Sequence, residues 1–191
     1  MKRFVAAALL LMMLALSACA PKVYTPGGNA TGNETLDAQA LAVLQEVCKT
    51  DASQEENLAA VFDWMLVEIG YRATTADTSN GFTEELTEQL ALDLLGSRRG
   101  SCDSEAALLC VLLDRMGCNP VIVQGQFLRS DGSEWVDHAW VIAEADGKTC
   151  HFDPLYGRFY AEDHSRDYFM ANDEMMQKTH AWDAAAYPAC G

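Results

Sequence analysis

The chain has 191 residues and half of them are apolar, which is enough for one domain with a sizeable core and too little for two of ordinary size. Its formal net charge is -15. This charge argues against nucleic acid as a partner, because binding DNA or RNA needs clustered Lys and Arg.

The first residues have the pattern of a secretory signal. Lys2 and Arg3 are followed by an apolar run, Phe4 to Leu16, that is too short for a typical membrane span. The run ends in Leu16-Ser17-Ala18-Cys19, which resembles the bacterial lipobox. We expect residues 1–18 to be a lipoprotein signal peptide and a lipid on Cys19 to anchor the chain outside the cytoplasm, on a bacterial membrane. The alternative is an ordinary cleaved signal peptide with a chance cysteine.

Residues 19–35 include a run rich in Pro, Gly, Thr and Asn, which predicts a flexible tether, so the domain is expected to occupy residues 36–191. Apolar residues at helical spacing predict a first helix over Leu36–Lys49. Ser53-Gln54-Glu55-Glu56 is a capping box that begins a second helix, which we expect to end at Gly70. Thr83 is a predicted N-cap for a third helix that ends near Gly96.

A fourth predicted helix begins at Cys102, directly after Gly100-Ser101, and Gly117 supplies its C-cap. A helix N-terminus stabilises a thiolate, so this position suits a nucleophilic cysteine. Cys110 lies two turns further along the apolar face, where we interpret it as a small buried hydrophobe.

The pattern after Gly117 changes to strands. Three are predicted, over Pro120–Phe127, Trp135–Glu144 and Lys148–Asp153, and the last two are joined by an Asp-Gly hairpin signal. The predicted fold class is α+β, with helices first and then an antiparallel sheet packed on the helix that starts at Cys102.

A thiolate nucleophile needs a base, and the base needs a third group that orients it. If Asp146-Gly147 forms a two-residue turn, His138 and Asp153 become diagonal neighbours on one face of the hairpin. A three-residue loop with a bulge would place them on opposite faces. The pairing therefore depends on the type of turn.

The chain has three other histidines. The two-residue turn places His151 on the same face, opposite Ile142, either as a competitor for the role of base or as a supporting group. His164 and His180 lie in the last third of the chain, where no comparable constraint applies.

These residues together resemble the core of the transglutaminase-like superfamily. The resemblance rests on Gly100-Ser101-Cys102 at a helix start, on Gly117 and Gly125, and on His138-Ala139-Trp140 followed by Asp153-Pro154. Weaker similarities upstream and downstream extend it over about Ala52 to Cys190. The ordered set is far more specific than any of its members.

The resemblance implies a papain-like fold in which Cys102 is the nucleophile, His138 the general base and acid, and Asp153 the group that orients the imidazole. It also implies acyl transfer from an amide of a protein or peptide through a thioester, without a cofactor. The acceptor decides between transamidation, deamidation and hydrolysis. The Cys102 backbone N–H is a reasonable first oxyanion donor, and the second stays unassigned.

The chain departs from the family pattern at Asp103, Glu105 and Leu155. Two carboxylates beside the nucleophile would oppose the thiolate. Two function classes therefore remain: a lipid-anchored cysteine acyltransferase or peptidase, and a binding module with the same fold and little or no catalysis.

Other roles for the cysteines are less well supported. Cys102, Cys110, Cys118, Cys150 and His151 lack the C-x-x-C or H-x-x-x-H spacing of a zinc site, so we expect no metal. Disulfides remain open because the chain is expected to be exported. No pairing follows from the sequence for the remaining cysteines: Cys48, Cys110, Cys118, Cys150 and Cys190.

Overall fold

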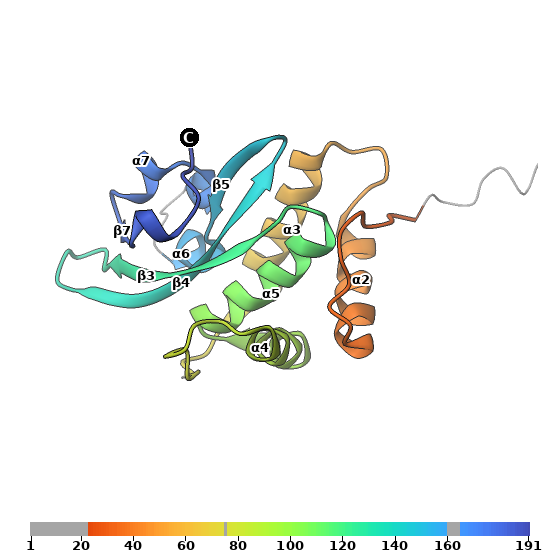
Figure 1. Cartoon of the computed structure of the whole chain (residues 1–191), viewed down its shortest axis with the longest axis horizontal. Helices are drawn as coiled ribbons and strands as arrows, with labels where there is room; N and C mark the ends of the chain where they lie inside the picture. The colour runs from red at the N-terminus through yellow and green to blue at the C-terminus, as the bar shows by residue number, and fades with distance from the viewer. Residues whose placement is uncertain (1–22, 75, 160–164) are drawn as a thin grey trace, which may run out of the picture.

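The computed structural model describes residues 23–74, 76–159 and 165–191. The predicted signal peptide, Cys19 and His164 lie outside these ranges. Within them, helices come first and an antiparallel sheet follows, so the predicted α+β fold class is confirmed (Figure 1). No helix in the described ranges is both long and apolar enough to span a membrane.

The first three helices that the structure describes begin at side-chain caps. They are α2 (Glu34–Val47), α3 (Gln54–Glu68) and α4 (Glu84–Ser97), and their first turns are closed by Asn33, Ser53 and Thr83. Ser53 and Glu56 form the predicted capping box, which satisfies two backbone N–H groups at once. The fourth helix, α5 (Cys102–Arg115), begins at the predicted residue.

The second predicted helix, α3, ends slightly before Gly70. Its last residue is Glu68 and its C-cap is Ile69, and Gly70 begins the short strand β1 (Gly70–Tyr71). This strand pairs in parallel with β2 (Arg99–Gly100), and the register sets Tyr71 against Gly100. The pair therefore brings Tyr71 next to the start of α5.

The main sheet has five strands in the order β6-β5-β4-β3-β7, and all its pairs are antiparallel. Asp146 and Gly147 both have positive φ, 49° and 76°, as a type I′ two-residue turn requires. Ala145 consequently pairs with Lys148, and the predicted register is confirmed. The strands are β3 (Val121–Leu128), β4 (Trp135–Ala145), β5 (Lys148–Phe152), β6 (Phe169–Ala171) and β7 (His180–Ala181).

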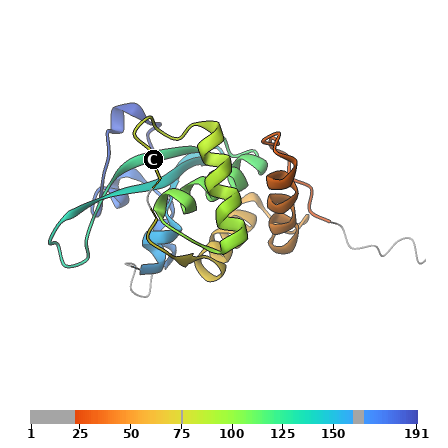
Figure 2. The same cartoon turned by 90° about the horizontal axis from the view of Figure 1, so that it is seen from below.

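The sheet separates two layers. Helices α2 to α5 lie on one side, and the C-terminal segment with α7 (Asp173–Met176) lies on the other (Figures 1 and 2). Side chains alternate along a strand, so Ala139, Val141 and Ala143 of β4 face the helices. Trp140 and Ile142 face the C-terminal segment and form a second, smaller apolar cluster there.

Part of the predicted tether lies against the domain. Tyr24 packs on the helical core, and the Gly28 N–H donates to the Arg115 carbonyl oxygen at 2.9 Å. Helix α5 ends at Arg115, where the last carbonyls have no partner within the helix. Thr31 and Gly32 donate to the Asp37 carboxylate. The segment 23–33, called the strap below, thus covers the C-terminal end of α5.

We expect Gly28→Ala to loosen the strap. A Cβ at this position would lie 1.8 Å from the Asp114 carbonyl oxygen, and overpacking of this kind costs about 1–3 kcal/mol. The measurement is limited proteolysis of the strap together with thermal unfolding. Gly27→Ala is the matched control, because nothing lies within 4 Å of a Cβ there. Equal behaviour of the two variants would contradict the close approach at Gly28.

Candidate active site

Cys102 occupies the first position of α5. Its N-cap residue, Ser101, makes no side-chain cap, and its Oγ accepts a hydrogen bond from the Thr74 hydroxyl at 3.0 Å instead. The first N–H groups of the helix are therefore left without a side-chain partner beside the half-buried Cys102 sulfur. The positive end of the helix dipole favours negative charge on that sulfur.

Asp153 is held from several directions. Its Oδ2 lies 2.7 Å from Nε2 of His138, and both side chains are buried. Its Oδ1 accepts the Tyr156 N–H at 2.8 Å, and its carbonyl accepts the Gly157 N–H, so it caps α6 (Pro154–Phe159). The structure brings His138 and Asp153 together as the turn type predicts.

Cys102 lies on the other side of the His138 ring. Because Nε2 donates to Asp153, Nδ1 is the ring atom left to face the thiol, and it is buried without a hydrogen bond. Burial alone lowers the pKa of His138, but the charge and hydrogen bond of Asp153 outweigh it and, with Cys102, raise it to about 10. Burial raises the pKa of Asp153, whereas His138 and His180 hold it well below its usual range. The histidine is therefore an imidazolium paired with a carboxylate.

His180 is a member of this cluster that the sequence did not identify. Its Nε2 lies 3.0 Å from Asp153 Oδ2, the same oxygen that His138 contacts. A carboxylate only accepts, so Nε2 carries the proton and Nδ1 accepts from the Thr179 hydroxyl at 2.9 Å. Burial lowers the pKa of His180, in spite of Asp153, so this ring stays neutral near pH 7. A two-residue strand such as β7 leaves no periodic signal in the sequence.

His151 is not a rival base. It lies on the predicted face, but its Nδ1 accepts the Trp140 indole N–H at 2.9 Å and its Nε2 donates to Asp173 at 2.8 Å. Trp140 in turn stacks on the His138 ring, with centroids 5.8 Å apart. His151 thus supports the indole that packs against the base.

Among the residues that the structure describes, two groups of side chains have ligand atoms within 4.8 Å of one another: His138, Asp153 and His180, and His151, Asp173 and Cys190. A histidine that binds a metal through Nε2 carries its proton on Nδ1 and donates it to an acceptor. Nδ1 of His151 faces the Trp140 N–H, which is itself a donor, so the second group does not fit a metal ion. In the first group, Nε2 of His138 and Nε2 of His180 both donate a hydrogen bond to Asp153 Oδ2, so neither nitrogen has a lone pair free for a metal ion.

The carboxylate of Glu105, which the sequence set beside the nucleophile, is paired with an arginine. Arg158 of α6 binds it with two hydrogen bonds, at 2.9 and 3.0 Å, and also donates to the carbonyls of Met65 and Leu66. Burial raises the pKa of Glu105 to about 7, against the effect of Arg158. The guanidinium offsets the negative charge that would oppose a thiolate.

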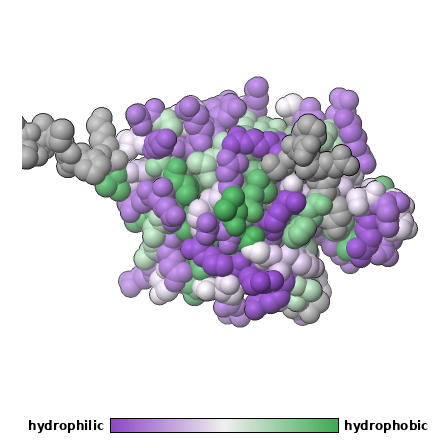
Figure 3. All heavy atoms as spheres, turned by 180° about the vertical axis from the view of Figure 1, so that it is seen from behind, coloured by the Kyte–Doolittle hydropathy of each residue, from purple (hydrophilic) through white to green (hydrophobic). Residues whose placement is uncertain are grey.

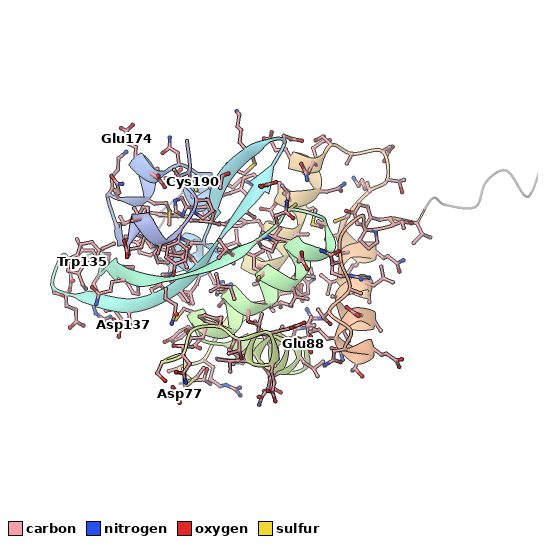
Figure 4. All side chains as sticks on the ribbon, viewed as in Figure 1. Asp77, Glu88, Trp135, Asp137, Glu174 and Cys190 are labelled. Atoms are coloured by element: carbon pink, nitrogen blue, oxygen red, sulfur yellow. The ribbon has the colours of Figure 1, made fainter. Side chains whose placement is uncertain are left out.

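Asp103 is the acidic neighbour that stays close to the nucleophile. Its Oδ1 lies 4.0 Å from the Cys102 sulfur. Burial raises its pKa, and His138 opposes this shift. Figure 4 shows Asp137, on β4, on the same side of the molecule as Asp77 in the loop before α4.

Two cavities meet at the reactive pair. One, of about 370 Å³, has mainly apolar walls, and the other, of about 660 Å³, is lined mostly by polar side chains. Both are lined by the same four residues: Tyr71, Cys102, Asp137 and His138. A group bound in either cavity therefore lies next to Cys102.

We expect His180→Ala to slow alkylation of Cys102 by iodoacetamide at pH 7 by about tenfold. Hydrogen bonds to charged groups contribute roughly 1.5–3 kcal/mol, and without this one Asp153 holds the His138 imidazolium less firmly. His180→Gln, which keeps an N–H donor, should recover part of the rate. The measurement is the rate as a function of pH, read at the Cys102 peptide by mass spectrometry.

His151→Ala is the matched control for that experiment. It removes an equally buried ring from the same face of the sheet, and that ring acts on His138 only through packing of the Trp140 indole, because it bonds to Asp173 instead of Asp153. The same loss of rate in both variants would mean that His180 acts only through packing.

A family model described as the transglutaminase-like superfamily matches residues 41–154. No curated protein matches the chain. A solved structure described as a TGase is 13% identical, with a TM-score of 0.50, and the match covers 68% of this chain and 34% of that one. An arylamine N-acetyltransferase from Bacillus cereus, described as having a Cys-His-Glu catalytic triad, is 20% identical, with a TM-score of 0.50 and coverage of 65% and 50%.

The chain therefore spans a third to a half of the length of these two structures, and at such identities the likeness shows the fold alone. The family match covers well over half of the chain. It shows that the chain belongs to the transglutaminase-like superfamily.

Proposed function

We propose that the protein is a cysteine enzyme that cleaves or exchanges amide bonds of proteins or peptides through a thioester. The observation that carries this proposal is the series of contacts from the start of α5 to Asp153. A half-buried cysteine sulfur at a helix N-terminus lies beside a histidine that a buried carboxylate orients. These are the three parts that an activated nucleophile needs.

The reaction follows from the positions of these atoms. Before the attack, the sulfur of Cys102 is a thiolate and its proton is the one held on Nδ1 of the His138 imidazolium. The thiolate attacks the amide carbonyl and forms a tetrahedral oxyanion near the helix N-terminus. Its collapse breaks the C–N bond, and Nδ1 returns the proton to the leaving amine. Water or a second amine then attacks the thioester and loses a proton to Nδ1, and collapse of the second tetrahedral intermediate breaks the C–S bond and restores the thiolate–imidazolium pair. Asp153 keeps Nε2 occupied throughout, so that only Nδ1 exchanges protons.

A binding module with the same fold is the second candidate. The observation that favours it is Asp103, whose carboxylate lies beside the sulfur and opposes a thiolate. The two candidates differ in one measurable property, the reactivity of Cys102.

We further propose that the protein is anchored through a lipid on Cys19 and works outside the cytoplasm. The strap supports a particular orientation of such an anchored domain. It contacts the C-terminal end of α5, whereas Cys102 lies at the other end, about 20 Å away for a helix of 14 residues. Figure 1 shows the chain reaching the domain on the side away from the β3–β4 hairpin. The site would then open away from the membrane.

An active enzyme should contain one thiol that reacts fast where ordinary thiols, with a pKa of about 8.5, do not. We expect Cys102 to be alkylated by iodoacetamide at pH 6 many times faster than any other cysteine. His138→Ala should remove the difference, and Asp153→Asn should reduce it. The imidazolium loses its proton as the pH rises through about 10, so the advantage of Cys102 should fade there. A slow Cys102 that is indifferent to His138 would favour the binding module.

Cys19→Ser should move the protein from the membrane fraction to the soluble fraction, because the lipid would have no attachment site. The measurement is fractionation of cells that produce the protein, with Cys102→Ser as a cysteine control that stays in the membrane fraction. Membrane retention of Cys19→Ser would contradict the anchor.

A further inference from the structure

The smaller of the two cavities has an unusual composition for a place next to a nucleophile. It is lined by Cys102 and His138, by the charged residues Arg129 and Asp137, and by apolar side chains from four separate elements: Tyr71, Phe127, Val136, Leu155 and Phe159. We call it the apolar pocket. The elements that supply its walls are β1, β3, β4 and α6.

Two of the wall residues are aromatic and exposed. Tyr71 is 45% exposed and Phe159 52%, and their rings meet edge to face with centroids 5.9 Å apart. Isolated apolar residues on a surface need no explanation, but an aromatic pair at the mouth of a cavity beside a reactive thiol indicates a contact surface. Figure 3 shows a face of the molecule that is mainly hydrophilic, with separate apolar groups that include one near its centre.

The inner walls are rigid. Phe127 packs edge to face on both His138 and Tyr156, with centroids 5.1 and 5.5 Å apart. Leu155 is buried and is held through α6, whose position is set by the Asp153 cap at one end and the Arg158–Glu105 pair at the other. A pocket with walls of this kind is formed before a ligand arrives.

The size and the charges limit the occupant. A volume of about 370 Å³ is at the low end for binding cavities, so it suits one large side chain and excludes a folded segment. Arg129 at its edge is paired with Glu134. Asp137, which lines both cavities, repels an acidic side chain. An uncharged apolar group is what these walls favour.

We propose that the apolar pocket binds an aromatic or branched aliphatic side chain of a peptide substrate, next to the amide that Cys102 attacks. This inference rests on the proposed function and specifies its substrate class. Since Cys102 and His138 line the pocket, a side chain bound in it lies close to the carbon that Cys102 attacks. Leu155, a departure from the family pattern in the sequence, becomes a residue that determines specificity.

The test uses a series of chloroacetamides as probes of the full chain. The unsubstituted amide reports the reactivity of Cys102 alone, and the N-benzyl and N-isobutyl amides add an apolar group that the pocket can bind. An N-carboxymethyl amide adds an acidic group, and an N-octyl amide adds a linear chain. Rate constants are read at the Cys102 peptide by mass spectrometry and divided by the rate for the unsubstituted amide.

We expect the benzyl and isobutyl probes to react about tenfold faster than the unsubstituted amide and the carboxymethyl probe to react more slowly. Phe159→Ala and Tyr71→Ala should both reduce the ratio. Trp135→Ala is the matched control, because this residue is also 45% exposed but lies at the start of β4, near the hairpin tip in Figure 4, and does not line the pocket.

The outcomes separate this inference from the proposed function. A fast Cys102 with equal rates for all probes would overturn the apolar pocket and leave the enzyme proposal standing. A slow Cys102 with every probe would contradict the enzyme and this inference with it. If the octyl probe were the fastest, the occupant would be a linear acyl chain, and the assignment to a peptide side chain would be wrong.

Discussion

The buried carboxylate of Asp153 is the group on which the rest of the site depends. It is only 1% exposed, and an ionised group so far from water is stable only when it is paired and hydrogen-bonded. Its three donors come from three elements: His138 on β4, His180 on β7 and the Tyr156 N–H on α6. The Asp153 carboxylate thus links β4 at the centre of the sheet, β7 at its edge and α6, which lines the apolar pocket.

The parts of the site that the sequence predicted are those with a local cause. Asp146-Gly147 adopts the positive φ values of a two-residue turn, and that turn alone fixes the register that sets His138 beside Asp153. Cys102 was placed by the apolar periodicity of α5 and the Gly-Ser start. The parts that the sequence missed join residues far apart in the chain: Arg158 and Glu105 are 53 residues apart, and His180 and Asp153 are 27. Short elements such as α6 and β7 carry no periodic pattern, so no local signal could have indicated these contacts.

Of the carboxylates near Cys102, two are paired with a cation and one is not, and this difference affects the reactivity of the sulfur. Arg158 offsets Glu105, and the imidazolium of His138 offsets Asp153, so neither carboxylate acts on the sulfur uncompensated. In the described part of the chain no arginine pairs with Asp103, which opposes the thiolate at short range. The helix N-terminus and the imidazolium act in the other direction. The helix N-terminus and the His138 imidazolium therefore increase the reactivity of Cys102, and Asp103 decreases it. In an enzyme the first two effects together are larger, and in a binding module the effect of Asp103 is larger.

Helix α5 links this chemistry to the rest of the chain. Its uncapped N-terminus lies beside the reactive sulfur, and its C-terminal carbonyl at Arg115 accepts the Gly28 N–H of the strap. Both ends of a helix have unpaired backbone groups that need partners. At one end the partner is a glycine segment of the same chain, which closes that end to other ligands. At the other end no side chain fills the role, because Ser101 bonds to Thr74 instead of capping the helix. The free N–H groups are thus available where negative charge develops during attack on an amide, and a capping side chain at Ser101 would compete with that charge.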